Sequence, residues 1–130
     1  MAALTDAAAQ QVLNWVTAQP TTAPVAPLVV ALETVAGDDV APGVEVTGGG
    51  YARQLYIPVA ASTASGVTSV RNAQLIRFEN MPAVTVVAFA VYDSAPTPFR
   101  WLYAALTTPR TFSAGDPAEF AIGELVITGR

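Results

Sequence analysis

The sequence predicts a mainly β protein: an antiparallel β-sandwich or jelly-roll-like barrel with one N-terminal α-helix. Three observations predict it. Six or seven short runs rich in Val, Ile and aromatic residues follow one another along the 130 residues. Proline and glycine separate these runs at short intervals, as in all-β sandwiches. Helical spacing of apolar residues is confined to the N-terminal end of the chain.

The first element is the expected helix. Thr5 or Asp6 can cap it, and it should extend for about 13 residues to Val16 or Thr17. Its apolar residues share one face, on which Trp15 is the largest. We therefore expect Trp15 to anchor the helix on a sheet.

The alternative is that the helix is an arm that docks onto a neighbouring subunit. The proline-rich segment 19–27 has no regular structure and is long enough to allow this. The predicted organisation is accordingly a helix with a proline-rich arm at 1–26 and a β-sandwich domain at 27–130.

The strands are predicted from β-branched and aromatic runs. The segment 83–92 is apolar on both faces and should be central, and 28–35 should also lie inside a sheet. In 75–79, Arg77 should point outward. Loops are expected at 36–43, 60–66 and 93–98, and a corner at 107–110. The full set of predicted strands is 28–35, 51–59, 75–79, 83–92, 99–106, 111–112 and 120–128.

The stretch 45–54 places three glycines, Gly48, Gly49 and Gly50, directly before Tyr51 and Arg53. Glycine allows positive φ and close backbone approach, so the run predicts a structural turn that leads into a strand. The alternative is an anion cradle. That alternative lacks the Lys and Ser/Thr that follow the glycines in a phosphate-binding loop.

Composition favours assembly. Hydrophobic residues make up 52 % of the chain and charged residues 12 %, which is half the usual share of roughly 25 %. So few charges predict a surface partly covered by partner chains, and hence a homo-oligomer. The basic residues form no cluster, so no nucleic-acid partner is expected. No apolar run is long enough for a membrane span, and the N-terminus does not resemble a signal peptide.

We predict no catalytic, cofactor-binding or metal-ligating residues. The chain has no histidine and no cysteine, which removes the commonest general base and metal ligands. Two alternatives stay open: the adjacent carboxylates Asp38 and Asp39 as a calcium site, and a carboxylate pair in a hydrolase cleft. Aromatic residues such as Tyr51, Tyr56 and Trp101 either stack on a sugar ring or belong to the core.

Five stretches together resemble small virion proteins of tailed bacteriophages, which are usually labelled tail-fibre-like, minor tail or decoration proteins. The resemblance covers roughly residues 27–129 and departs from the pattern at 60–80 and 96–99. The stretches Gly-Gly-Gly-Tyr-Ala-Arg and Leu-Thr-Thr-Pro are specific in combination. The segments that carry it are 27–34, 45–54, 87–93, 101–116 and 123–128.

The resemblance implies a non-enzymatic structural protein, a decoration or tail-associated subunit that assembles symmetrically on larger capsid or tail proteins. Such a protein is made in the host cytoplasm and resides in the virion. The alternative is a carbohydrate-binding module used in host attachment. Under either hypothesis the candidate interface or glycan contacts are Trp15, Tyr51, Arg53 and Trp101.

Overall fold

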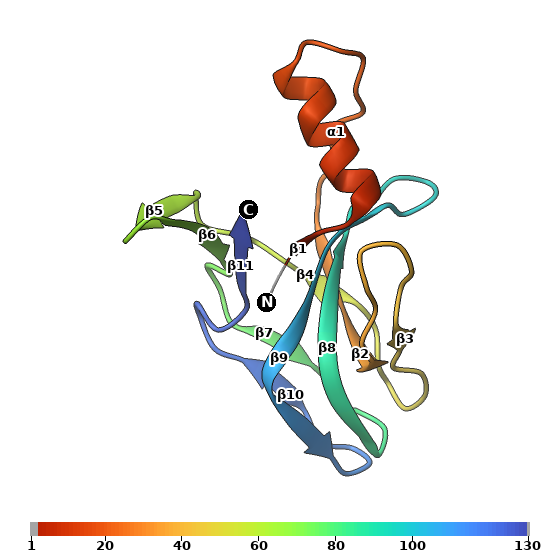
Figure 1. Cartoon of the computed structure of the whole chain (residues 1–130). Coiled ribbons are helices and arrows are strands. Elements are labelled where there is room, and N and C mark those ends of the chain that lie inside the picture. Colours follow the sequence, from red (N-terminus) through yellow and green to blue (C-terminus); the bar gives the residue numbers. More distant parts are fainter. Residues whose placement is uncertain (1–2, 130) are drawn as a thin grey trace.

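A computed structural model describes residues 3–129, and it confirms a mainly β fold with one N-terminal helix (Figure 1). Eleven strands lie within this part of the chain, more than the six or seven expected. In chain order the elements are β1 (Ala3–Leu4), α1 (Asp6–Val16), β2 (Val29–Val35), β3 (Val44–Glu45), β4 (Gln54–Leu55), β5 (Ser62–Ala64), β6 (Val67–Arg71), β7 (Ile76–Phe78), β8 (Val84–Tyr92), β9 (Arg100–Phe112), β10 (Ala118–Phe120) and β11 (Val126–Gly129).

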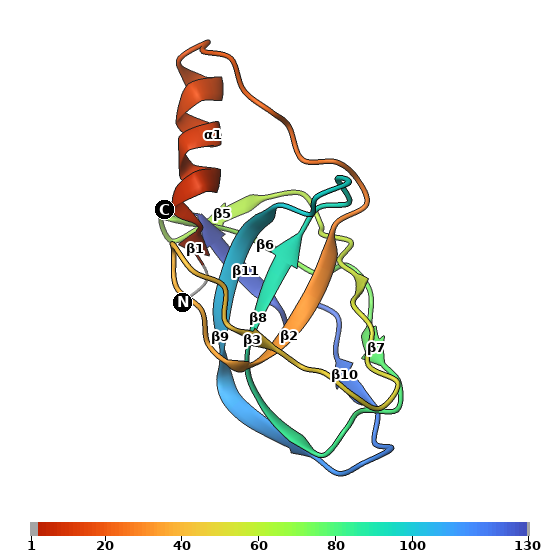
Figure 2. The same cartoon turned by 90° about the vertical axis from the view of Figure 1, so that its right-hand side faces the viewer.

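The strands form three antiparallel sheets. The largest has the order β1-β9-β8-β2-β3, and β4 also pairs with β2. A two-stranded sheet joins β10 to β7, and a three-stranded sheet has the order β11-β6-β5. The long strands of the large sheet curve over the smaller sheets (Figure 2). Within residues 3–129 the sheets stay open, so the sandwich describes the fold better than a closed barrel does.

The core lies between the large sheet and the smaller ones. Leu32, Phe89 and Val91 face it from the large sheet, and Phe78 and Phe120 face it from β7 and β10. The rings of Phe78 and Phe120 meet edge to face with their centroids 6.0 Å apart. All five side chains are at most 3 % exposed. Their burial holds the two layers together, because each side chain contributes about 1.5–3 kcal/mol when it is fully removed from water.

The interior strands are those with the most continuous apolar runs. β8 lies between β9 and β2, and β2 lies between β8 and the pair β3 and β4. The expectations that 83–92 is central and that 28–35 lies inside a sheet are therefore confirmed. In β7, the burial pattern points Arg77 outward as expected, between two buried neighbours.

The corner predicted at 107–110 is wrong, because β9 continues through it. The register places Arg110 opposite Val86 and Ala105 opposite Ala88. Four residues of β9 therefore stand opposite a single residue of β8. This bulge accommodates a proline, which has no N–H to donate to the ladder. Residues 107–109 do interrupt the regular pairing, but they do so as a long bulge, and the strand continues beyond them.

Three other boundaries differ from expectation. The strand predicted at 51–59 is reduced to β4, because only Gln54 and Leu55 pair with β2, while Tyr51 reaches β2 through its side-chain hydroxyl. The loop predicted at 60–66 contains β5, which forms a hairpin with β6 through Ser65 and Gly66, both at positive φ. The final strand predicted at 120–128 is two strands, because a turn with Gly123 at positive φ separates β10 from β11.

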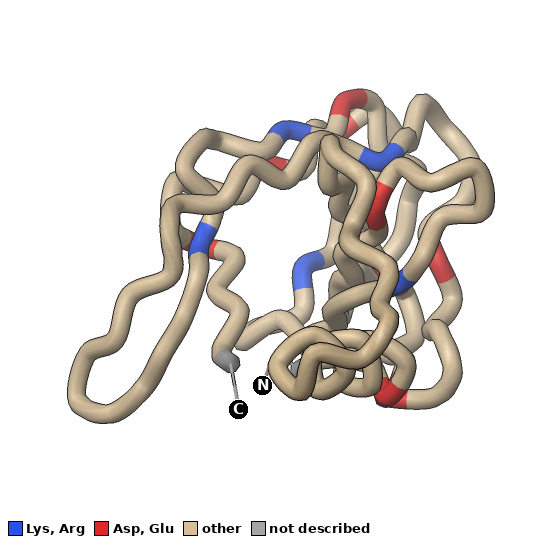
Figure 3. The backbone as a smooth tube through the Cα atoms, turned by 90° about the horizontal axis from the view of Figure 1, so that it is seen from above, with Lys and Arg blue, Asp and Glu red and all other residues tan. Residues whose placement is uncertain are grey.

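Charged residues are sparse and of mixed sign along the backbone (Figure 3). Several of them neutralise one another at the surface: Arg53 with Glu45, Arg77 with Glu79 and Glu119, and Arg110 with Glu124. Within residues 3–129, no helix combines the length and the hydropathy that a bilayer span needs.

Candidate functional site

The base of α1 is fixed to the large sheet. Thr5 is the N-cap: its Oγ1 accepts a hydrogen bond from the Ala8 N–H at 3.1 Å and donates one to the Arg100 carbonyl at 2.9 Å. The Thr5 N–H also donates to the carbonyl of Trp101 at 3.1 Å. A threonine at this position satisfies one of the free N–H groups of the first turn. The first turn of α1 is consequently held in one orientation on β9.

Beyond its first turn, α1 projects past the edge of the sandwich (Figures 1 and 2). Only Ala8 is buried, whereas Leu13, Trp15 and Val16 are 64 %, 72 % and 65 % exposed. The expectation that Trp15 anchors the helix on a sheet is wrong, because no sheet lies beneath the outer turns. At 100° per residue, the apolar residues from Ala8 to Val16 cover an arc of roughly 160°. We call the solvent-facing part of this surface, Val12, Leu13, Trp15 and Val16, the apolar arc.

The linker returns along α1 and is bonded to it. The Gln11 side-chain oxygen accepts hydrogen bonds from the Thr21 hydroxyl at 2.7 Å and from the Thr22 N–H at 2.8 Å. Further along, the Val25 N–H donates to a carboxylate oxygen of Asp93 at 3.2 Å. The helix and the linker thus run side by side and form one projection, which we call the arm.

A groove of about 290 Å³ lies between the two halves of the arm. Its walls are almost entirely apolar and include Val12, Trp15, Pro24 and Trp101. Trp101 is only 8 % exposed, and its indole N–H donates to Asp93 at 3.2 Å. Two of the four candidate contact residues, Trp15 and Trp101, are therefore brought together in this groove.

The other two candidates, Tyr51 and Arg53, lie at a different place in the fold, where both side chains bond Glu45. Glu45 accepts a hydrogen bond from the Tyr51 hydroxyl at 2.8 Å and two from the Arg53 guanidinium at 3.0 and 2.8 Å. Burial raises the pKa of Glu45, but these bonds outweigh it and hold the pKa below its usual value. The guanidinium of Arg53 also stacks on the ring of Tyr92, 4.0 Å from its centroid. Both side chains are engaged within the sandwich.

The open aromatic platform considered for sugar stacking is not present at the residues named for it. Tyr56 is 2 % exposed and donates its hydroxyl to the Leu125 carbonyl, and Trp101 is also buried. The ring of Tyr51 stacks on Phe78 with centroids 5.8 Å apart. These rings belong to the interior of the sandwich.

The three glycines form a turn that packs against the segment before β8. The Gly50 N–H donates to the Asn80 carbonyl at 2.7 Å, and a Cβ on Gly49 would lie 2.7 Å from the same oxygen. Gly48 and Gly49 have φ values of 100° and 57°. The run therefore brings two backbones into contact, and no lysine is available to complete a phosphate site.

Asp93 is a central residue of the arm's attachment that the sequence did not single out. It is 3 % exposed, and its carboxylate accepts bonds from the N–H groups of Val25, Ala95 and Phe99 and from the indole of Trp101. Burial raises its pKa, but these hydrogen bonds outweigh the effect and lower it overall. An aspartate directly after a strand and before a proline-rich turn is the only local signal for this role.

Among the described residues, no three His, Cys, Asp or Glu side chains come together as a metal site. The carboxylate of Asp38, considered above for calcium, accepts bonds from the N–H groups of Val40 and Ala41 at 2.9 and 2.7 Å. It therefore stabilises its own turn.

The fold and the arm can now be compared with known proteins. A family model described as Podophage GP4 fiber I protein gp80 matches residues 3–128. The chain belongs to this family. The gp80 fibre match confirms the resemblance to tail-fibre-like phage proteins and extends it to the arm, which the resemblance from residue 27 onward had left out. No curated protein matches the chain significantly.

Membership in the gp80 fibre family makes this chain a structural, tail-associated protein of a phage virion, found with other virion proteins. The description of the family names a fibre protein.

Proposed function

We propose that this chain is a non-enzymatic structural subunit of a phage tail fibre that repeats symmetrically and attaches to another virion chain through its arm. In this proposal residues 1–26 form the attaching arm and residues 27–130 form the sandwich body. The fibre family favours the tail over the capsid as the location.

The observation that carries the proposal is the apolar arc of α1. An amphipathic helix of a soluble domain normally buries its apolar face on its own sheet. Here Leu13, Trp15 and Val16 are all more than 60 % exposed, because the helix is fixed to the body only at its first turn and its outer turns project away from it (Figure 1). Covering these three side chains with a partner would contribute several kcal/mol, at about 1.5–3 kcal/mol for each fully buried residue. Tryptophan is also one of the residues enriched among interface hot spots.

The composition of the surface supports repetition. A symmetric contact places each residue near copies of the same surface, so unpaired like charges are costly there. With 12 % charged residues, and several of those paired within the chain, the surface has few such charges. The same pairing supports a non-enzymatic role, because Glu45, Glu119 and Glu124 are each neutralised by an arginine.

The test is the mass of the purified chain in solution, measured by light scattering across a concentration series. We expect an oligomer, or a stable complex with a purified tail protein of the same virion. The variant Leu13→Ser/Trp15→Ser should lose the assembly and keep the wild-type melting temperature, because neither side chain supports the sandwich. Asn14→Ser, on the polar side of the same helix, is the matched control and should assemble normally.

Tryptophan fluorescence adds a local readout. Trp101 is already buried in the free chain, whereas Trp15 is exposed there and should become protected from aqueous quenchers on assembly. Normal assembly of the Leu13→Ser/Trp15→Ser variant would refute the role of the arm. A chain that stays monomeric and binds no tail protein would refute the proposal as a whole.

A further inference from the structure

Most charged side chains of the described residues have a bonding partner, but three do not. Among residues 3–129, Arg71 is the one arginine that neither forms an ion pair nor donates a hydrogen bond from its side chain. In the same part of the chain, the carboxylates of Asp6 and Asp39 accept no hydrogen bond, whereas every other carboxylate bonds an arginine or a backbone N–H. All three side chains are exposed. The surface therefore presents one free positive charge and two free negative charges.

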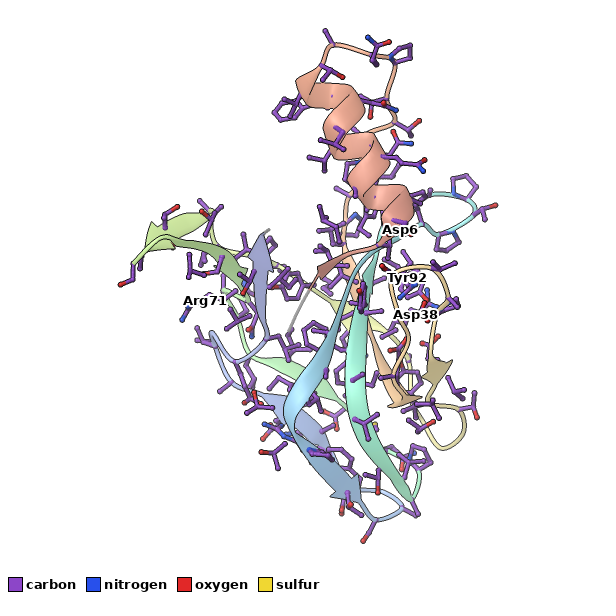
Figure 4. All side chains as sticks on the ribbon, in the orientation of Figure 1. Asp6, Asp38, Arg71 and Tyr92 are labelled. Atoms are coloured by element: carbon purple, nitrogen blue, oxygen red, sulfur yellow. The ribbon has the colours of Figure 1, made fainter. Side chains whose placement is uncertain are left out.

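These free charges lie on different sides of the molecule. The Asp6 N–H donates to the Asp39 carbonyl at 2.8 Å, which holds the start of α1 against the loop after β2 and brings the two acidic residues together. Arg71 is the last residue of β6 and lies across the molecule from Asp6 and Asp38 (Figure 4). Because one chain does not bring these charges together, a protein partner for either has to come from another molecule.

Asp6 and Asp39 line a hollow at the foot of α1 that suits a long basic side chain. The hollow has a volume of about 480 Å³, and its lining includes Val40, Pro42 and Phe99. Such apolar surface can cover the methylene groups of an arginine while its guanidinium donates to carboxylates. Arg100 also lines the hollow, but its guanidinium already donates to the Asp38 carbonyl at 2.6 Å. Two carboxylates against one guanidinium leave the hollow negative.

Arg71 lies at the foot of a hairpin with an open edge. We call this hairpin, formed by β5 and β6 at residues 62–71, the side hairpin; it stands out from the sandwich (Figure 1). Within residues 3–129, β6 pairs with β11 and β5 forms the outer edge of the small sheet, with all of its residues exposed. Proteins usually protect such edges with charged residues or proline. β5 contains neither, and Arg71 is the only charged residue between positions 54 and 76. This surface therefore favours contact with another chain.

We infer that the side hairpin of one copy docks at the foot of α1 in the next copy, where Arg71 lies between Asp6 and Asp39. The occupant is a second copy because the free charges of the chain are complementary in sign and lie on two separate surfaces. Since these surfaces differ, the contact is head to tail, and its repetition closes into a ring or continues as a filament. The inference rests on the proposed function only for the repetition of the chain, and it names the surfaces that meet.

The ion pairs determine which surfaces meet more than how tightly they bind. An exposed ion pair contributes little net affinity, whereas like charges held in contact are costly. Reversing one charge should therefore weaken the contact, and reversing both should restore it with the signs exchanged. The contact should also weaken with added salt, because the Debye length falls from about 30 Å at 0.01 M to about 8 Å at 0.15 M.

The test is sedimentation equilibrium of the full chain over a concentration series, combined with a reciprocal charge swap. Arg71→Glu and Asp39→Arg should each weaken self-association by about tenfold or more, because each places like charges in contact. The double variant Arg71→Glu/Asp39→Arg should recover most of the wild-type association. The two single variants change the net charge in opposite directions and the double variant leaves it unchanged, so overall repulsion between chains does not explain this pattern.

Ala114→Glu, in the exposed turn after β9, is the control for added negative charge and should associate like the wild type. All variants should keep the wild-type melting temperature, because the replaced side chains bond no other described residue. The inference is overturned if the wild type does not self-associate at low salt, if either single variant associates normally, or if the double variant recovers nothing.

The arm is tested by a different measurement. Binding of a purified tail protein should be lost in Leu13→Ser/Trp15→Ser and retained in Arg71→Glu. Failure of the head-to-tail contact is therefore distinguishable from failure of attachment through the arm.

Discussion

The hydroxyl of Tyr51 accepts a hydrogen bond from the backbone N–H of Leu32 at 2.9 Å. This bond fills a gap in the edge of the large sheet. β4 pairs with β2 at Val29 and Val30, and β3 pairs with it from Glu33 onward, so neither strand reaches the Leu32 N–H. The tyrosine side chain therefore takes the place of a ladder bond, because a buried N–H without a partner is costly.

Replacing this tyrosine tests the relationship. Tyr51→Phe should lower the free energy of unfolding by about 1–3 kcal/mol, because it leaves the Leu32 N–H unpaired and removes the bond to Glu45. Urea denaturation followed by circular dichroism measures the loss. Tyr103→Phe is the matched control, since the Tyr103 hydroxyl bonds no other described residue. Equal stability of the two variants would contradict the role assigned to Tyr51.

The glycine turn allows a second comparison. Gly49 and Gly66 both have positive φ, so alanine at either position should cost about 1–2 kcal/mol in backbone strain. At Gly66 a Cβ meets open space, whereas at Gly49 it would lie 2.7 Å from the Asn80 carbonyl oxygen. Gly49→Ala should therefore be the more destabilising in urea denaturation. If Gly66→Ala cost as much, the close contact with Asn80 would be irrelevant.

Asn72 is fully buried and joins two turns. Its amide donates to the carbonyls of Gln74 and Ala121, and its carbonyl oxygen accepts from the Leu125 N–H. Asn72→Ala should cost about 2–4 kcal/mol, because the buried Leu125 N–H and two partly buried carbonyls lose their partner. Thermal denaturation gives the size of the loss, with the surface change Asn14→Ala as the control. Hydrogen exchange should show the Leu125 N–H to be the group most affected, and unchanged protection there would count against this assignment.

Two cross-strand neighbours, Glu33 and Glu45, should respond to pH in opposite ways. Burial raises the pKa of Glu33 above its usual value of 4.5, despite the backbone N–H groups of Gly43 and Gly37 and the charge of Arg100. Its ionised form therefore destabilises the fold at high pH and imposes no penalty once the pH is below 4.5. As the pH rises above that value, Glu33→Gln should gain stability relative to the wild type.

For Glu45 the effect of pH on stability has the opposite sign. Its pKa is held below 4.5, so its charge stabilises the fold above that pH, and the contribution is lost as the pH falls through the folded-state pKa. Glu45→Gln should thus be less stable than the wild type at neutral pH, and the difference should shrink in acid. Unfolding free energies from about pH 3 to 7 decide between these trends. Parallel curves for both variants would show that neither carboxyl has a shifted pKa.

Local sequence patterns were sufficient to predict the interior strands, because the burial of a strand follows directly from a continuous apolar run. The strands 28–35 and 83–92 are buried on both faces, and no arrangement of this chain could leave so many β-branched residues in water. Thr5 as a helix cap was likewise a local feature. The predicted strand boundaries were wrong where one residue is compatible with two local structures. Pro109 is typical of a corner, yet a bulge accommodates it equally well.

The sequence by itself determined the class of fold, the interior strands, the helix and the lack of a histidine- or cysteine-based site, because these depend on residue type and short-range spacing. Only the tertiary structure decided that Trp15 faces solvent, that Trp101 is buried, and that both line the groove of the arm. The reason is physical: an amphipathic helix has an apolar face whatever it packs against. Whether that face meets its own sheet or another chain depends on where the linker and β1 fix it. That position is set by hydrogen bonds between residues far apart in the sequence, such as the one from the Thr5 hydroxyl to the Arg100 carbonyl and the one from the Val25 N–H to the Asp93 carboxylate.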